Sequence, residues 1–392
     1  MMKTPSFDFI DISVDSVNKF KEELCGDHVE ITENDVSKIV VLSDGLGSGV
    51  KANILSTLTS KIASTMLQKG LDIIDVLETL EKTLPTCQVR KLAYSTFTIV
   101  QIFNDGRVVI IEFDNPKVVY IRNDAILELD VEDIKFKDKT IHKYTTNYKN
   151  GDLISIFSDG VIHTGIGKHI YLGWQYEEVV KVITTKNRKE KTAKAVSQSI
   201  IDICKTFSDQ EPGDDTTCVV IKIRDIEPVT LFAGPPEDQN KDKEIVQDLM
   251  HAPGKKVVCG GTAANICSRE LDKAIETNID ELDFDIPPYA KIEGLDLVTE
   301  GVITLNYTIK LMNQYIDRTI DPNVLKKNNG GVLLFKLLMS QCTHLNILIG
   351  NNNNPAHQNP YFPSELSYKW IAVKELADTM EKLNKKVTIT TY

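Results

Sequence analysis

The chain lacks the features of membrane and nucleic-acid-binding proteins. No apolar run reaches the roughly 18 residues that a membrane span needs, and the start reaches Asp8 and Asp11 without the apolar core of a signal peptide. Basic residues are also in deficit, since 45 Lys and Arg against 56 Asp and Glu give a net charge of −11. Proteins that neutralise phosphates or bind anionic lipid usually carry the opposite sign. We therefore expect a cytoplasmic protein with protein or small-molecule partners, no nucleic acid and no membrane.

Cysteine is sparse and shows no pairing pattern. The seven cysteines are an odd number and include no CxxC pair, which argues against a disulfide framework or a zinc knuckle. We expect reduced thiols that pack as small apolar side chains. Hydrophobic residues make up 42% of the 392 positions, so the chain can bury cores in the two or three domains that its length suggests.

The first half of the chain contains grouped strands and paired helices. Apolar residues recur every three or four positions over residues 51–67 and 72–84, which predicts two amphipathic helices in tandem. Two further helices are expected at 175–183 and 191–207, the first of them preceded by a loop. Strand-like runs occupy 38–42, 94–103, 107–113, 117–122, 125–129, 152–157 and 218–223. The turn Asn104-Asp105-Gly106 predicts a hairpin that the next two runs continue as a meander, so we expect an α+β fold with antiparallel sheets.

After Arg224 strands and helices alternate. Strands are expected at 229–232, 256–259, 295–298, 345–349 and 387–391, and helices include 263–271, 302–315 and 372–382. This alternation predicts a smaller α/β domain with a mostly parallel sheet. The boundary is expected between Asp225 and Pro228, which gives domains of residues 1–225 and 229–392.

Aspartates at strand ends are the main chemical feature of the first half. Asp44 and Asp159 each follow an apolar strand inside a Ser-Asp-Gly triplet. Asp214 and Asp215 stand directly before another strand, and Asp27 lies upstream. Hard divalent cations prefer oxygen ligands, and a two-metal centre needs carboxylates that converge from different strands. A glycine after the aspartate lets the backbone come close, so its carbonyl can serve as a further ligand.

Asp-Gly is also a common hairpin turn, so each pair has a purely structural alternative. Asp105-Gly106 lies between two strand-like runs and is interpreted as a turn only. Asp44-Gly45 is instead followed by a glycine-rich loop and a helix, which no tight hairpin requires. Asp214 and Asp215 repel each other as neighbours, which a bound cation would offset, although two solvated turn aspartates are the alternative.

Four motifs resemble, in chain order, those of the metal-dependent serine/threonine protein phosphatases, the PPM or type 2C family. They are Gly26-Asp27, Ser43-Asp44-Gly45-Leu46-Gly47-Ser48-Gly49, Ser158-Asp159-Gly160 and Gly213-Asp214-Asp215-Thr216-Thr217. The second motif is similar to the bacterial branch typified by stage II sporulation protein E, and the resemblance covers residues 1–225. It implies a β-sandwich flanked by helices, in α-β-β-α layers, with two Mn²⁺ or Mg²⁺ ions between the sheets.

The resemblance also assigns roles to residues. It implies that Asp27, Asp44, Asp159 and Asp214 bind metal, with Gly45 contributing its carbonyl. Asp44 and Asp159 would act in catalysis through a metal-bound water that attacks phosphorus, without a side-chain nucleophile.

Other site residues are less clearly marked. Asp215 occupies a position where the family often has Asn or Asp. His28 and His163 lie beside metal motifs and are candidates for the general acid, with packing or surface roles as the alternative. Arg90 is the nearest arginine in a loop that could contact a phosphate.

The implied function is hydrolysis of phosphoserine or phosphothreonine in a phosphoprotein of bacterial signalling, such as an anti-sigma-factor antagonist. The alternative is a non-catalytic switch that binds metal or a phosphoprotein, and retention of all four metal aspartates favours catalysis.

Two glycine turns mark the second domain. Gly260-Gly261 and Glu300-Gly301 each follow a strand and precede a helix, as in ordinary β-to-α turns. If both lie on the carboxyl edge of one sheet, a small ligand could bind there. We therefore expect a regulatory domain that binds a partner protein or a small ligand.

Overall fold

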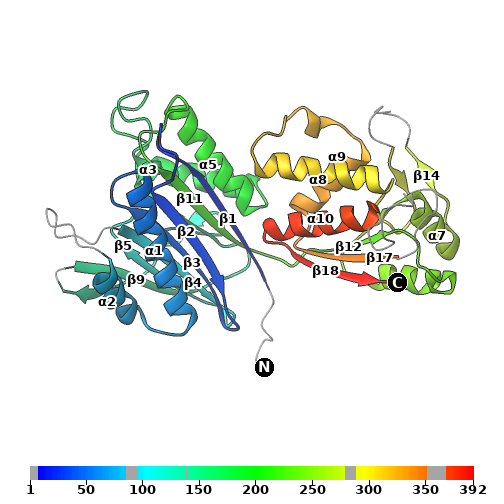
Figure 1. Ribbon diagram of the computed structural model, residues 1–392, viewed down its shortest axis with the longest axis horizontal. Helices are drawn as coiled ribbons and strands as arrows, with labels where there is room; N and C mark the ends of the chain where they lie inside the picture. The colour runs from blue at the N-terminus through cyan, green and yellow to red at the C-terminus, as the bar shows by residue number, and fades with distance from the viewer. Residues whose placement is uncertain (1–7, 85–94, 138, 279–287, 351–367) are drawn as a thin grey trace. The chain divides into compact units, whose positions relative to one another are not determined.

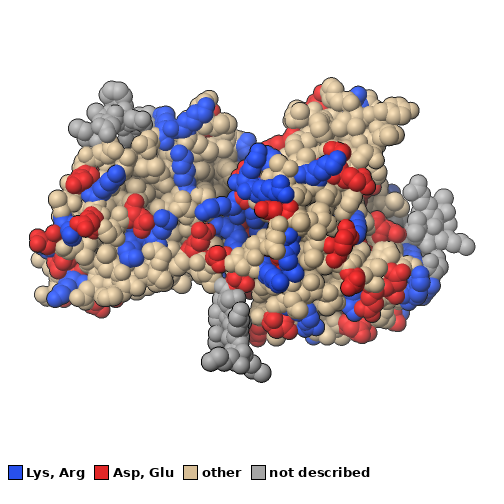
Figure 2. All heavy atoms as spheres, turned by 180° about the vertical axis from the view of Figure 1, so that it is seen from behind, with Lys and Arg blue, Asp and Glu red and all other residues tan. Residues whose placement is uncertain are grey.

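The computed structural model describes residues 8–84, 95–137, 139–278, 288–350 and 368–392. They divide into two compact units, residues 1–225 and 226–392, which are described separately. Arg90, Cys87 and the start of the expected strand at Tyr94 lie outside the described residues. Within those ranges no helix combines the length and the apolar character of a membrane span. Lys and Arg side chains are interspersed with Asp and Glu on the face drawn in Figure 2.

The first unit contains two antiparallel sheets (Figure 1). One has five strands in the order β1–β11–β10–β6–β7, and the other has six in the order β2–β3–β4–β5–β9–β8. The strands are β1 Phe9–Val17, β2 Asp27–Glu33, β3 Ser37–Gly45, β4 Ser95–Phe103, β5 Arg107–Phe113, β6 Val119–Arg122, β7 Ala125–Ile126, β8 Val131–Phe136, β9 Lys139–Asn147, β10 Leu153–Phe157 and β11 Thr216–Arg224.

The two sheets pack face to face, and helices cover their outer faces. Successive side chains of β3 point to opposite faces, so Val40 and Leu42 pack between the sheets while Ile39 and Val41 contact helices. Helices α1 (Gly49–Gln68) and α2 (Ile73–Thr83) cover the six-stranded sheet. Helices α4 (Tyr176–Lys189) and α5 (Ala193–Phe207) cover the five-stranded sheet. These α-β-β-α layers confirm the predicted fold class.

Three local predictions in this unit were wrong or incomplete. Strands β6 and β7 do not continue the meander, because β5 pairs with β9 whereas β6 pairs with β10 in the other sheet. Strands β8 and β9 were not predicted, since their mixed Lys, Thr and Ile pattern is weak. The loop expected after β10 begins with a short helix, α3 (Asp159–Ile162).

The second unit contains a seven-stranded sheet in the order β14–β15–β16–β13–β12–β17–β18. Its strands are β12 Pro228–Ala233, β13 Lys255–Cys259, β14 Glu276–Thr277, β15 Ala290–Lys291, β16 Leu297–Thr299, β17 His344–Ile349 and β18 Lys386–Thr391. Its helices are η1 Gln239–Lys241, α6 Asp242–His251, α7 Gly261–Leu271, α8 Val302–Ile316, η2 Val324–Lys326, α9 Gly330–Ser340 and α10 Tyr368–Lys382. The five strands from β16 to β18 pair in parallel, which confirms the predicted mostly parallel sheet.

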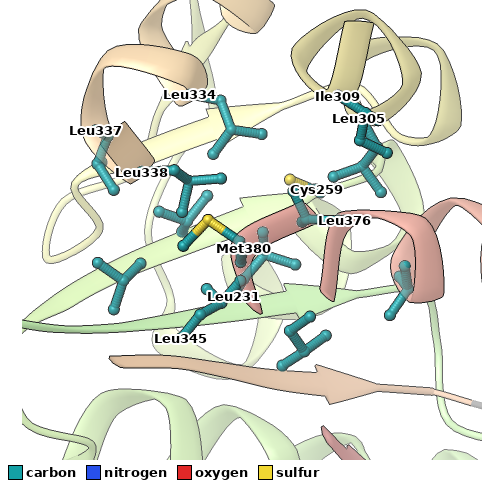
Figure 3. Close-up of a cluster of buried hydrophobic side chains, with 14 of the residues drawn as sticks. Leu231, Cys259, Leu305, Ile309, Leu334, Leu337, Leu338, Leu345, Leu376 and Met380 are labelled. Atoms are coloured by element: carbon teal, nitrogen blue, oxygen red, sulfur yellow. The ribbon is translucent and has the colours of Figure 1, made fainter. Parts of the chain in front are cut away.

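Helices lie on both faces of this sheet. Helices α6 and α7 pack on one face and α8, α9 and α10 on the other. Figure 3 shows the core on the face covered by α8, α9 and α10. There Leu231 and Leu345 from neighbouring strands contact Leu376 and Met380 of α10. Cys259 packs in the same cluster, and burial raises the pKa of its thiol to about 12. Six cysteines lie within the described residues as free thiols, and all of them except Cys25 are buried.

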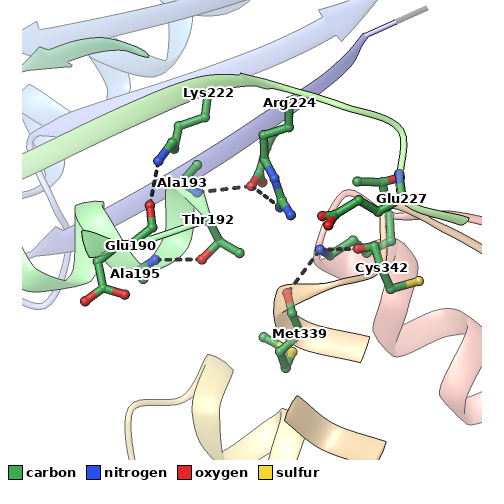
Figure 4. Close-up of polar contacts among 12 residues, drawn as sticks. Glu190, Thr192, Ala193, Ala195, Lys222, Arg224, Glu227, Met339 and Cys342 are labelled. Carbon is green, nitrogen blue, oxygen red and sulfur yellow. Dashed lines mark hydrogen bonds and ion pairs between the residues drawn. The ribbon is translucent and has the colours of Figure 1, made fainter. Parts of the chain in front are cut away.

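Buried cations bind the carboxyl ends of two helices (Figure 4). In the first unit Lys222 Nζ on β11 donates to the carbonyl oxygen of Glu190, at 2.6 Å, where α4 ends. In the second unit Lys385 Nζ donates to the carbonyl oxygen of Met339 in the last turn of α9, at 3.3 Å, and to that of Cys342 just beyond the helix, at 2.6 Å. Both contacts satisfy carbonyl groups that a helix end leaves without an intrahelical partner.

Candidate metal centre

Strand register brings the first two predicted aspartates together. Asp27 at the start of β2 pairs directly with Asp44 near the end of β3 in the antiparallel ladder. Directly opposed residues point to the same face of a sheet, so both carboxylates lie on one side. Beside them, Gly45 N donates to the carbonyl oxygen of Gly26 at 3.1 Å, which extends the pairing.

A serine connects Asp27 to the other sheet. Ser158 follows β10, and its Oγ donates to Asp27 Oδ2 at 2.7 Å. The same Oγ accepts from Thr217 N of β11 at 2.9 Å. The ends of β2, β10 and β11 therefore meet at one end of the sandwich.

Close backbone packing places Asp159 beside the Asp214–Asp215 segment. Asp159 is the first residue of α3, and a Cβ added to Gly160 would lie 2.0 Å from the carbonyl oxygen of Asp215. A Cβ on Gly45 would likewise lie 2.1 Å from the carbonyl oxygen of Ala52 in α1. The glycine of each Ser-Asp-Gly triplet is thus required because backbone approaches backbone there.

The carboxylates destabilise one another's charged forms. Burial is the main cause that raises the pKa of Asp44 to about 9, and the charges of Asp27, Asp159, Asp214 and Asp215 raise it further. Burial likewise raises the pKa of Asp27 to about 7, with smaller contributions from Asp215 and Asp159. Burial also raises the pKa of Asp214. The five motif aspartates therefore lie close enough together for their charges to raise the pKa of Asp44.

The donor set fits a hard cation in its chemistry. Asp27 Oδ1 and Asp215 Oδ2 are buried and have no hydrogen-bond partner within the described residues. Orphaned carboxylate oxygens among repelling carboxylates are the environment that a divalent cation stabilises. As these side chains stand, no three described His, Cys, Asp or Glu residues converge closely enough to hold a metal ion. The oxygen donors therefore suit a hard cation in type, although the side chains do not surround one point closely enough to coordinate an ion.

The aspartates differ in their exposure. Asp27 and Asp215 are buried, with 5% and 4% of their surface exposed. The side chains of Asp159 and Asp214 are nearly half exposed and lie near His163 Nδ1 and Lys19 Nζ, at 3.6 and 4.0 Å. The buried pair forms the inner side of the site, and Asp159 and Asp214 form the side open to solvent.

Three residues of the site, Asp215, Lys19 and Ser158, were missed or given too little weight in the sequence analysis. Asp215 is more buried than Asp214, and its Oδ1 accepts from the backbone N of Lys19 at 3.0 Å. No sequence spacing could have joined Lys19 to this site, because only the fold brings it there. Ser158 did have a signal, since Ser precedes Asp in both Ser-Asp-Gly triplets.

The two histidine candidates behave differently. His28 Nδ1 lies 2.7 Å from Ser60 Oγ of α1, and burial lowers the pKa of the ring, which supports a packing role. His163 directly follows α3, and its Nδ1 lies 3.6 Å from Asp159 Oδ2 on the open side. Arg90 lies outside the described residues.

Comparison with known proteins identifies similarity over the first unit. Residues 35–224 match the family model described as stage II sporulation protein E (SpoIIE). Among curated proteins none matches the sequence. The phosphatase domain of SpoIIE from Bacillus subtilis, solved with a fragment of its regulatory domain, is 20% identical, with a TM-score of 0.46 over 56% of this chain and 64% of that chain.

Two further solved structures are similar at lower identity. The RsbU and RsbW domains of Rv1364c from Mycobacterium tuberculosis are 14% identical, with a TM-score of 0.48 over 62% of this chain and 68% of that chain. A serine/threonine phosphatase of S. agalactiae is 14% identical, with a TM-score of 0.41 over 55% of this chain and 100% of that chain.

Proposed function

Residues 35–224 are a SpoIIE-like segment of the PPM phosphatase family, and on this premise we propose that the protein is a metal-dependent serine/threonine phosphatase. It would hydrolyse phosphoserine or phosphothreonine in a bacterial signalling phosphoprotein. The observation that carries the proposal is the meeting of Asp27 and Asp44 in one strand register, with three further motif aspartates acting on the pKa of Asp44.

The proposed metal ligands are Asp27, Asp44, Asp159, Asp214 and the carbonyl of Gly45, which would hold two Mn²⁺ or Mg²⁺ ions. Such ions, when bound, supply a water of lowered pKa and neutralise charge on the phosphoryl oxygens. The orphaned Oδ2 of Asp215 supports adding this residue to the set.

The protein's own residues hold these groups in place. The Ser158 hydroxyl orients Asp27, and Gly160 lets α3 present Asp159 against the Asp215 backbone. Asp44 and Asp159 are the proposed catalytic carboxylates, and no side-chain nucleophile is required. His163, half exposed beside Asp159, is the better placed of the two candidates for protonating the leaving seryl oxygen.

The second unit is proposed to be an accessory domain that regulates the phosphatase by binding a partner protein or a small ligand. A cytoplasmic location is proposed for the whole chain, in keeping with its acidic composition.

The test compares two aspartates that precede glycines. Asp44→Asn removes one carboxylate from the site, whereas Asp105→Asn alters an exposed turn where Asp105 Oδ1 accepts from Arg107 N. We expect Mn²⁺-stimulated hydrolysis of an aryl phosphate and of a phosphoserine peptide by the wild type. Asp44→Asn should lower kcat/KM by about a hundredfold or more, since a metal centre supplies several kcal/mol of transition-state stabilisation.

Asp105→Asn should retain the wild-type rate. A wild type without Mn²⁺-stimulated turnover, or an Asp44→Asn variant as active as Asp105→Asn, would contradict catalysis. The non-catalytic alternative predicts the first result together with binding of the phosphopeptide, which titration calorimetry detects.

A further inference from the structure

Strand β18 forms one edge of the seven-stranded sheet in the second unit (Figure 1). Within the described residues it pairs only with β17. Five of its six residues, all except Val387, are exposed, and Ile389 is 37% exposed. An exposed edge strand presents backbone N–H and C=O groups to which another strand can pair.

The hydrogen bonds to β17 show which backbone groups face outward. Lys386 N donates to the carbonyl oxygen of Thr343, directly before β17, and Tyr392 N donates to that of Ile349, at 3.0 Å each. The register between these two bonds is unbroken. Since successive residues of a strand direct their backbone groups to opposite sides, the N–H and C=O groups of residues 387, 389 and 391 point away from β17.

Strand β18 lacks the features that usually protect a sheet edge. Natural edge strands are commonly very short, rich in charge, interrupted by proline or a bulge, or lined by inward-pointing charged residues. This strand is six residues long, contains no proline and no bulge, and carries no charge after Lys386. Its backbone is therefore open to pairing along its whole length.

The other edge strands of the described chain each have a protective feature. Strands β7 and β14 are only two residues long. Strands β2 and β8 each contain three acidic or basic residues. In β1, Asp11 and Asp15 point toward α5, where they accept from Ala193 N and Lys194 Nζ. The contrast singles out β18 as the edge suited to a partner strand.

A second copy of β18 matches all three outward-facing residues in one register. In an antiparallel ladder, residues that exchange two hydrogen bonds alternate with residues that exchange none. A twofold axis at Ile389 places Ile389 opposite its own copy and Val387 opposite Thr391, so all three exchange both bonds. A twofold axis at Thr388 or Thr390 would match only two of them.

The side chains opposed in this register are compatible. Val387, Ile389 and Thr391 lie on one face, where Val387 packs against the core under α10. There each β-branched residue opposes another β-branched residue, and on the other face Thr388 opposes Thr390. Such cross-strand pairs stabilise antiparallel sheets.

The single charged residue of the strand faces carboxylates of the second copy. Lys386 opposes Tyr392, and both side chains point to the face that α6 covers. The Tyr392 hydroxyl donates to Asp248 Oδ2 of α6, and Glu244 is exposed one turn earlier on the same helix. The Lys386 ammonium of each copy therefore approaches acidic surface of the other, and this charge complementarity favours a second copy as the partner.

We propose that β18 pairs antiparallel with β18 of a second copy of this chain, about a twofold axis at Ile389. The two seven-stranded sheets then form one continuous sheet, and the second unit is the dimerisation domain of the protein. The interface belongs to the second unit alone and does not depend on the phosphatase assignment.

Sedimentation velocity of the full chain over a concentration series tests the dimer. Wild type should change from monomer to dimer in the micromolar range, because a pair of edge strands forms a small interface. Ile389→Lys should weaken the dimer by about tenfold or more, since the twofold axis places two lysines directly opposite each other. Ile126→Lys is the matched control, because Ile126 is an exposed isoleucine of another edge strand, β7. It should dimerise like the wild type.

Charge complementation tests the register. Ile389→Glu alone should also stay monomeric, whereas an equimolar mixture of Ile389→Lys and Ile389→Glu should form a heterodimer, because only the axis at Ile389 opposes residue 389 to itself. The proposal is overturned if wild type stays monomeric, if Ile389→Lys dimerises like Ile126→Lys, or if the mixture forms no heterodimer.

Hydrogen exchange followed by mass spectrometry needs no variant. Raising the wild-type concentration through the monomer–dimer transition should slow exchange in peptides that span β18, where the amides of Val387, Ile389 and Thr391 gain partners. Peptides that span β7 should not change. Unchanged exchange at β18 in a dimeric sample would overturn the proposal, because the dimer would then use another surface.

Discussion

The hydroxyl of Ser158 lies between Asp27 of one sheet and the backbone N–H of Thr217 in the other. Its neighbour Gly160 has a comparable effect through the absence of a side chain, because α3 and the Asp215 backbone meet there. Both residues act on the carboxylates without being proposed ligands. The positions of Asp27 and Asp159 therefore depend on the Ser158 hydroxyl and on the missing side chain of Gly160.

Gly160→Ala tests this packing. The new Cβ would lie 2.0 Å from the carbonyl oxygen of Asp215, a backbone atom that cannot rotate away. We expect the free energy of unfolding to fall by about 1–3 kcal/mol, as for other overpacked sites. Gly213→Ala, two residues before Asp215, is the control, since nothing lies within 4 Å of its added Cβ. Urea denaturation should show a change below about 0.5 kcal/mol for the control; equal losses in both variants would refute the packing argument.

At the scale of elements, long-range contacts decide how the strands and helices combine. Strand β11 is buried along its whole length, and its Lys222 lies 7% exposed against the end of α4. Desolvation by burial is the main reason that the pKa of Lys222 falls to about 8. The unfolded chain, where lysine titrates at about 10.4, therefore binds more protons than the folded chain between these two values.

The contribution of Lys222 to stability should consequently rise with pH from about 8 to about 10, by up to about 3 kcal/mol. Subtracting the Lys222→Met curve from the wild-type curve isolates this group from other titrations. Lys189→Met, an exposed position in the last turn of α4, should keep the wild-type pH slope. Urea unfolding at several pH values measures how the free energy of unfolding of each of the three proteins changes with pH. Identical slopes for wild type and Lys222→Met would show that burial does not lower the pKa of Lys222.

At the scale of the whole molecule, each unit has its own cores, between and outside the sheets in residues 1–225 and on both sheet faces in residues 226–392. Units with separate cores commonly unfold in separate transitions. The proposed metal ligands all belong to the first unit, so a metal should stabilise that unit alone.

Differential scanning calorimetry with EDTA and then with Mn²⁺ measures this. Mn²⁺ at a hundred times its Kd should stabilise one transition by about 2.7 kcal/mol and leave the other unchanged. In Asp44→Asn the shift should shrink, whereas in Asp105→Asn it should persist. An equal shift of both transitions, or none in wild type, would count against a metal centre in the first unit.

The sequence by itself determined the elements and the chemistry available to them. Continuous apolar runs located most strands, such as β3 and β12, because both of their faces are buried. Apolar residues every three or four positions located most helices, such as α1, because one face of each helix is buried. Each Ser-Asp-Gly triplet follows one of these apolar runs, so the sequence placed Asp44 at the end of β3 and Asp159 directly after β10.

Only the tertiary structure decided which elements and residues meet. The pairing of Asp27 with Asp44, the transfer of β6 to the second sheet and the burial of Asp215 each depend on partners far away in the chain. Many pairings satisfy the same local pattern, and the choice among them comes from packing whole sheets and helices together, which no short stretch of sequence contains.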